Sequence, residues 1–184
     1  MNAKELKLLL VRARLEEIRK GKFEGQKWHK KEKEAIIGLG FARKKGAGFE
    51  LTEKGRKKVK IVMTGGVFDI LHLGHVYTLE RARRMGDALV VVVAHDSTVK
   101  RLKGRPPVHS ARHRAELLGK LRCVDVALVG DAKDWQMVVR RVRPDVIAFG
   151  YDQKADDRLR ARVRKIRGML HEKVFKTSRI VEEL

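Results

Sequence analysis

The stretch T-G-G-V-F-D-I-L-H-L-G-H, from Thr64 to His75, decides how the rest of this sequence is interpreted. It follows K-I-V-M, a short apolar run typical of a buried strand, and places two glycines, one acid and two histidines where that strand ends. Glycines there let backbone N–H groups approach a phosphate without a Cβ in the way. A helix beginning near Gly74 would direct its positive end to the same place. The stretch therefore predicts a phosphate-facing bend with both histidines on one side.

The residues around this stretch alternate apolar strands with helices. Strands are expected at 60–64, 88–95, 124–130, 144–150 and 173–175, and helices at about 75–86, 110–121, 134–142, 156–168 and from 177. This alternation predicts an α/β fold with a Rossmann-like, five-stranded parallel sheet covered on both faces, over residues 59–184. Ligands of such sheets bind outside the carboxyl ends of the strands, where Thr64 lies.

Residues 1–58 follow a different pattern. Helical spacing is expected over 3–20 and about 30–39, followed by two short strands around G-A-G and by Thr52 as a helix N-cap. The segment I-I-G-L-G-F-A-R-K-K-G-A-G-F-E-L-T-E-K-G-R-K resembles the wing end of winged helix-turn-helix domains, although one helix before it is missing. We therefore expect a small winged helix-turn-helix-like domain over 1–58.

The charge of the chain suits an anionic partner. The net charge is +21; residues 1–60 hold 19 Lys/Arg and 8 Asp/Glu (+11), and the other 124 hold 25 and 15 (+10). A heavily charged surface typical of a protein working at high temperature is the alternative. We expect a cytoplasmic protein without membrane contact. No apolar run approaches the roughly 18 residues that span a bilayer, the N-terminus lacks a secretory pattern, and Cys123 is the single cysteine.

Three roles are open to His72 and His75. Metal ligation lacks a fitting third partner nearby, and structural capping or core packing is the usual role of an isolated H-x-x-H. The third role is to stabilise charge on a transferring phosphate, which needs hydrogen-bond donors and no metal. The adjacent glycine bend favours the third role.

The stretch G-G-V-F-D-I-L-H-L-G-H is similar to the G-x-F-D-x-x-H-x-G-H signature of the cytidylyltransferase-like nucleotidyltransferases. Further motifs follow in order: L-K-G-R-P-P-V-H-S-A-R-H-R-A-E-L-L, V-D-V-A-L-V-G-D, R-P-D-V-I-A-F-G-Y-D-Q and F-K-T-S-R-I-V. Within that family, V-K-R-L-K-G-R-P-P-V and G-Y-D-Q resemble the archaeal-type FAD synthases, which are FMN adenylyltransferases. This resemblance implies AMP transfer from ATP to FMN, giving FAD and pyrophosphate. The near alternative is a CTP-dependent cytidylyltransferase acting on glycerol 3-phosphate or a similar phosphorylated alcohol.

The resemblance also implies roles for individual residues. His72, His75 and Lys103 would stabilise charge during transfer, and Mg2+ or another divalent cation would accompany the nucleotide, with no side chain assigned as its ligand. Asp69 matches the signature acid, and whether it meets a metal or braces the loop is open. The residues implied in nucleotide binding are Thr64, Gly65, Gly66, Val67, Phe68, His72, His75, Arg114, Gly150, Asp152, Thr177 and Ser178.

A hypothesis of another class is a DNA-binding transcriptional regulator whose nucleotidyltransferase domain senses a ligand. The charge and the winged-helix resemblance of residues 1–58 motivate it. A homodimer is expected by analogy with the family alone. The expected contacts with DNA phosphates are Lys30, Lys31, Lys33, Arg43, Lys44 and Lys45.

Overall fold

The computed structural model describes residues 2–24, 28–150 and 162–166. The chain divides into two compact units, Met1–Lys60 and Ile61–Leu184. The predicted site residues Asp152, Thr177 and Ser178 and the strand expected at 173–175 lie outside the described residues. Within the described ranges, no helix is long and apolar enough to cross a membrane.

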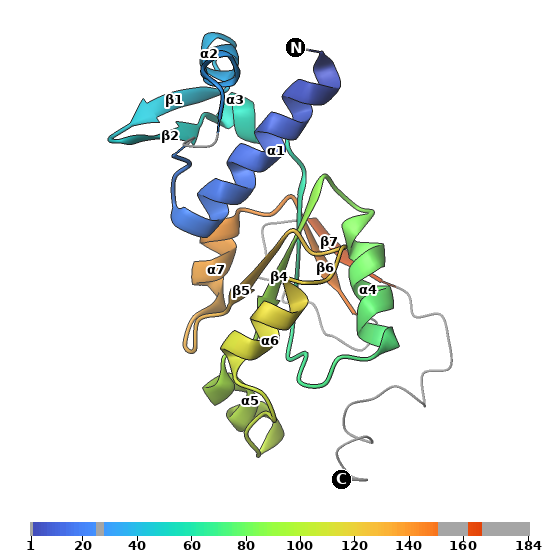
Figure 1. Cartoon of the computed structure of the whole chain (residues 1–184). Coiled ribbons are helices and arrows are strands. Elements are labelled where there is room, and N and C mark those ends of the chain that lie inside the picture. Colours follow the sequence, from blue (N-terminus) through green and yellow to red (C-terminus); the bar gives the residue numbers. More distant parts are fainter. Residues whose placement is uncertain (1, 25–27, 151–161, 167–184) are drawn as a thin grey trace. The chain divides into compact units, whose positions relative to one another are not determined.

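The N-terminal unit, Met1–Lys60, contains helices on either side of a hairpin (Figure 1). Thr52 caps the last of these helices, as predicted, by accepting a hydrogen bond from the Gly55 N–H. The Phe23 ring stacks with Trp28 and with Phe49, at centroid distances of 5.4 and 5.6 Å, and forms the aromatic core of the unit. The elements are α1 (Ala3–Lys20), α2 (Lys30–Gly38), β1 (Ala42–Lys45), β2 (Gly48–Leu51) and α3 (Glu53–Arg56).

The second unit, Ile61–Leu184, contains a five-stranded parallel sheet, which confirms the predicted fold class. The strand order is β5-β4-β3-β6-β7, so the chain runs outward from β3 on one side and then returns to β6 on the other. In open α/β sheets ligands bind where the strand order reverses, which here is beside the carboxyl ends of β3 and β6. The strands are β3 (Ile61–Gly66), β4 (Ala88–Val93), β5 (Val126–Val129), β6 (Val146–Phe149) and β7 (Arg162–Lys165).

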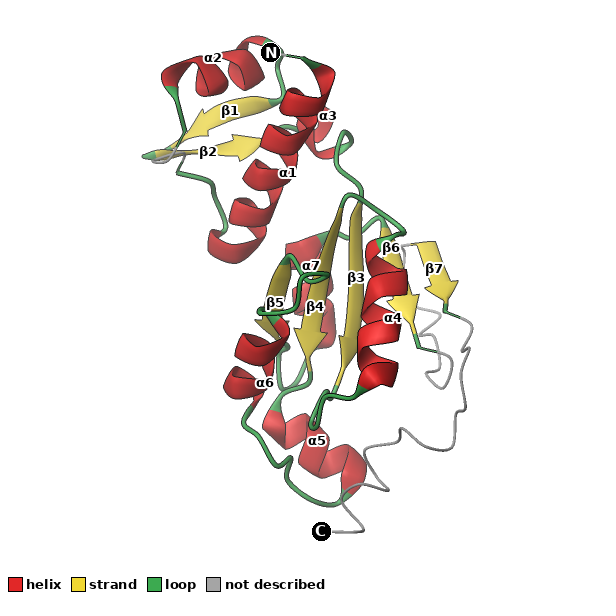
Figure 2. Cartoon of the chain, turned by 45° about the vertical axis from the view of Figure 1, so that its right-hand side comes forward, coloured by secondary structure: helices red, strands yellow, loops and turns green. Residues whose placement is uncertain are grey.

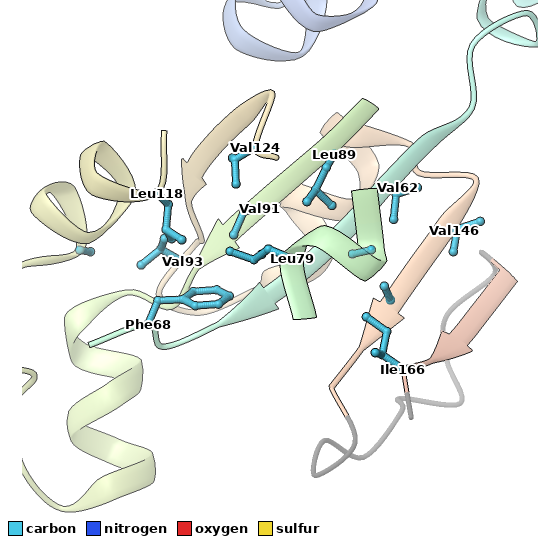
Figure 3. Close-up of a cluster of buried hydrophobic side chains, with 13 residues drawn as sticks. Val62, Phe68, Leu79, Leu89, Val91, Val93, Leu118, Val124, Val146 and Ile166 are labelled. Carbon is cyan, nitrogen blue, oxygen red and sulfur yellow. The ribbon is translucent and has the colours of Figure 1, made fainter. Parts of the chain in front are cut away.

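Helices cover both faces of this sheet (Figure 2). Leu79 of α4 and Leu118 of α6 pack with Leu89 and Val91 of β4 in one buried cluster (Figure 3), and α7 lies on the opposite face. All six residues of β4 are buried, as expected for a strand covered on both sides. The helices of this unit are α4 (Leu73–Arg83), α5 (Asp96–Lys103), α6 (Ala111–Leu118) and α7 (Trp135–Val142).

Two elements differ from the sequence prediction. The helix expected at 156–168 is wrong where the structure describes it, because Arg162–Lys165 forms β7 beside β6. β7 is the edge strand of the sheet. Its sequence R-V-R-K is charged and lacks the apolar run by which the other strands were predicted. Helix α5 was not predicted, because Val99 is its one buried residue and no apolar stripe marks it.

Candidate active site

The bend predicted after the first strand of the sheet lies at the carboxyl end of β3. Thr64 is 2% exposed, and its hydroxyl donates to the Ala148 carbonyl of β6 at 2.9 Å, so this side chain ties the two strands together near their carboxyl ends. Gly65 and Gly66 are half-buried and form the last two residues of β3, where they pair with Val92 and Val93 of β4. The chain therefore turns directly after Gly66, and not at the two glycines as predicted. A Cβ at Gly66 would lie 2.9 Å from the Phe68 ring, so any other residue there would force this ring to shift.

Phe68 connects the bend to the core. Its φ of 51° lies in the left-handed region, which a bulky residue adopts only where its surroundings hold it. The ring is 7% exposed and belongs to the cluster shown in Figure 3. It also meets the His75 ring edge-on, at a centroid distance of 5.2 Å. Core packing therefore positions one face of a candidate catalytic histidine.

The two signature histidines stack on each other at the start of α4. His72 is the N-cap residue of α4 and His75 lies in its first turn. Their ring centroids are 3.9 Å apart with an interplanar angle of 27°, so both lie on the same side, as their spacing predicts. Burial lowers the pKa of His72 below its ordinary value of 6.5. His72 is therefore mainly neutral at pH 7 and can donate one N–H.

Asp69 braces the site from inside. It is 2% exposed, and its Oδ1 accepts hydrogen bonds from the backbone N–H groups of Val108 and His109, at 2.8 and 3.3 Å. Its Oδ2 lies 3.6 Å from the Arg105 guanidinium, which is about one-third exposed. Because the carboxylate holds the segment that leads into α6, the structure favours the bracing role for Asp69 over metal binding.

Arg105 is a candidate site residue that sequence reasoning missed. The motif L-K-G-R directed attention to Lys103, which is the exposed last residue of α5. The cation held against the signature acid is Arg105, two residues further along. No sequence pattern separates these two cations, because the contact depends on how Gly104 turns the chain at φ 73° after α5.

Arg114 joins three segments of the site from a buried position. Its guanidinium donates to the carbonyl groups of His109 (2.8 Å), Val67 (2.5 Å) and Ala94 (3.0 Å), and to the Asp96 carboxylate (2.5 Å). The side chain is 1% exposed. These bonds fix the loop after β3, the end of β4 and the residues before α6 relative to one another. The guanidinium therefore shapes the site, and its position does not favour the direct nucleotide contact that the motif implies.

Residues 63–183 match the family model described as cytidylyltransferase-like. The chain belongs to this family. FAD synthases of Pyrococcus abyssi and Thermococcus kodakarensis are 40% and 43% identical to it, over 71% and 72% of this chain and 95% of each of those proteins. The lipopolysaccharide core biosynthesis protein of Thermoplasma volcanium has a solved structure that is 39% identical, with a TM-score of 0.56, over 60% of this chain and 98% of that one.

These relatives match the cytidylyltransferase-like domain and not the whole chain. The aligned 71% of this chain covers 95% of the Pyrococcus abyssi protein, and the aligned 60% covers 98% of the Thermoplasma volcanium chain. The few per cent of those two proteins that lie outside the alignments are too short to form a second unit the size of Met1–Lys60. The N-terminal unit is therefore an addition to the domain that these relatives share.

The described part of this cytidylyltransferase-like domain offers no set of metal ligands. Across residues 2–24, 28–150 and 162–166, no group of three or more His, Cys, Asp or Glu side chains is placed to hold a metal ion. Asp69, the nearest acid to the signature histidines in the sequence, is used in bracing the loop. Of the remaining predicted residues, Gly150 is half-buried directly after β6.

Proposed function

We propose that this chain transfers AMP from ATP to FMN, giving FAD and pyrophosphate. The family membership makes it a nucleotidyltransferase. The choice of ATP and FMN is supported by relatives named FAD synthase, which are 40–43% identical over nearly their whole length. The observation that carries the reaction is the stacked pair of His72 and His75, which lies beside a glycine bend at the start of α4.

The reaction forms one P–O bond and breaks another. A phosphate oxygen of FMN attacks the α-phosphorus of ATP, and the bond from the α-phosphorus to the oxygen bridging to the β-phosphate breaks, releasing pyrophosphate. Because a phosphate monoester loses its second proton at a pKa of about 6, the nucleophile is ionised at neutral pH and needs little base catalysis. Catalysis then depends on positioning and on donors directed at the charge that develops.

Each part of the site has a role in that scheme. N–H groups in the first turn of α4, directly after the glycine end of β3, face the phosphates. His72 and His75 donate to the oxygens on the α-phosphorus and to the leaving pyrophosphate. Arg105 and Lys103 add positive charge around them. Asp69 and Arg114 act as positioning residues, because their polar atoms hold the loops that carry the other groups.

Mg2+ enters this scheme as part of the MgATP substrate. The cation would neutralise charge on the nucleotide phosphates, and no residue of the described ranges is assigned as its ligand. Gly150, Asp152, Thr177 and Ser178 stay proposed nucleotide contacts on the motif match alone. A homodimer and a cytoplasmic location also stay predictions, and size-exclusion chromatography with light scattering tests the first.

A substrate screen tests the proposal. The purified full chain is incubated with Mg2+ and either ATP plus FMN or CTP plus glycerol 3-phosphate, while FAD is followed by chromatography and pyrophosphate by a coupled assay. The His72→Asn variant, prepared identically, reports the background of contaminating enzymes. We expect FAD and pyrophosphate in equal amounts from the first pair. Product from the second pair alone would overturn the substrate assignment, and no pyrophosphate from either pair would overturn the transferase.

A further inference from the structure

The N-terminal unit, Met1–Lys60, has no part in the proposed reaction. All the site residues named above lie in the second unit, and 95% of each FAD synthase relative aligns with only 71–72% of this chain. A compact unit with its own core that these relatives do without points to a second activity. We propose that the N-terminal unit binds double-stranded DNA through the backbone phosphates.

The first observation in favour is the concentration of charge. Residues 1–60 hold 19 Lys/Arg and 8 Asp/Glu, so they carry +11, whereas the other 124 residues carry +10. The N-terminal unit therefore has about twice the charge density of the catalytic one. An adaptation of the whole surface to high temperature would raise both signs of charge throughout. A strong excess of one sign in one unit instead favours a polyanionic partner.

The second observation is which elements carry the exposed cations. Lys30 and Lys31 lie in the first turn of α2, and Lys44 lies on β1 of the hairpin; all three are exposed. The major groove of B-form DNA admits either an α-helix or a two-stranded ribbon. The unit presents one of each. The major groove of A-form RNA is too narrow and deep for either, so duplex DNA fits this surface better than duplex RNA.

The cations of the hairpin differ in how much positive charge they can offer to DNA phosphates. Arg43 and Lys45 both pair with the Glu50 carboxylate across the hairpin, each at 2.7 Å. These two cations lower the pKa of Glu50 to about 2, so the acid stays ionised and offsets one of their charges. Lys44 points to the other face of β1, since successive side chains of a strand alternate. Lys30 lies 3.8 Å from Glu34, but both side chains are exposed and such a pair is weak. The cations expected to dominate the contact with phosphates are therefore Lys30, Lys31 and Lys44, while Lys33 is half-buried.

The test is a charge reversal at these three positions in the full chain. The variant is Lys30→Glu, Lys31→Glu and Lys44→Glu. Glutamate in the first turn of α2 is compatible with the helix dipole, so this helix should survive the change. A second variant with glutamine at the same positions avoids introducing acids. The matched control reverses Arg84, Lys120 and Arg122, which are exposed in the second unit on the side away from the strand carboxyl ends and change the net charge equally.

Binding to a labelled DNA duplex of about 20 base pairs is followed by fluorescence anisotropy at several salt concentrations. We expect wild-type affinity to fall steeply with salt, and the loss of three phosphate contacts to reduce the log–log slope by about 2.7. At low salt the reversal variant should bind DNA at least 10-fold more weakly than the wild type, and the glutamine variant should also bind more weakly. The affinity of the control should stay within about 3-fold of the wild-type value. FAD formation should be unchanged in all three.

Several outcomes would overturn the inference. Absent or salt-insensitive binding by the wild type would exclude DNA as the partner. Equal weakening in the reversal variant and the control would show that net charge, and not this surface, attracts DNA. Tighter binding of an RNA duplex of the same length would assign the unit to another class of partner. None of these results bears on FAD formation, so the two proposals fail separately.

Discussion

Replacing Arg114 by methionine tests whether this arginine holds the active-site loops together. The change removes donors from three carbonyl groups and from the Asp96 carboxylate around a guanidinium that is 1% exposed. A neutral hydrogen bond contributes about 1 kcal/mol net and a charged one about 1.5–3 kcal/mol. Asp96 is 42% exposed, so water can solvate its carboxylate in the variant. Loss of this charged hydrogen bond therefore costs less free energy than loss of a buried one. The free energy of unfolding of the second unit should therefore fall by about 3–5 kcal/mol.

Scanning calorimetry of the full chain measures this loss. For a unit of this size it corresponds to a fall in Tm on the order of 10–20 °C. Arg112→Met on the same helix is the matched control; its side chain is 86% exposed and paired with Glu116, so it should cost less than about 0.5 kcal/mol. If Arg114→Met kept its Tm within about 2 °C while raising the KM for ATP, the guanidinium would be a nucleotide contact and the reasoning would fail.

Three further predictions concern the bend and the histidines. His72→Asn and His75→Asn should each lower kcat about 10²–10³-fold, with small changes in KM and Tm; a change in KM alone would contradict charge stabilisation in the transition state. Gly66→Ala should cost about 1–3 kcal/mol and lower activity, because its Cβ would meet the Phe68 ring at 2.9 Å. Gly65→Ala, with its nearest contact at 3.5 Å, should be milder, and equal effects would count against the packing argument. Because folding lowers the pKa of His72, the unfolded state binds more protons just below pH 6.5, so stability should fall on acidification through that range. His72→Gln should reduce this dependence in pH-resolved urea unfolding, and an unchanged dependence would refute the cause.

The buried strands and the stacked arrangement of His72 and His75 could be predicted because their signals are local. The run A-L-V-V-V-V appears as β4 with every residue buried. The spacing of His72 and His75 similarly fixes both rings on one side of the start of α4. In each case a few neighbouring residues contain the whole physical reason for the structure.

The connections between loops could not be predicted, since they depend on distant contacts. Arg114 donates to groups 5, 20 and 47 residues away, and no short pattern encodes such a set. Arg105 was overlooked in favour of Lys103 for the same reason. The edge strand β7 has the charged sequence R-V-R-K, and α5 has Val99 as its one buried residue, so neither carries the apolar pattern that reveals the other elements.

Phe68 links the hydrophobic core of this domain to the proposed catalytic histidines. The same ring packs among the buried residues, limits position 66 to glycine and meets His75. A substitution that repacks the core near this ring would therefore change turnover before it changed the fold. Turnover thus becomes a sensitive reporter of core packing, and attempts to stabilise the enzyme should begin at the far end of the sheet.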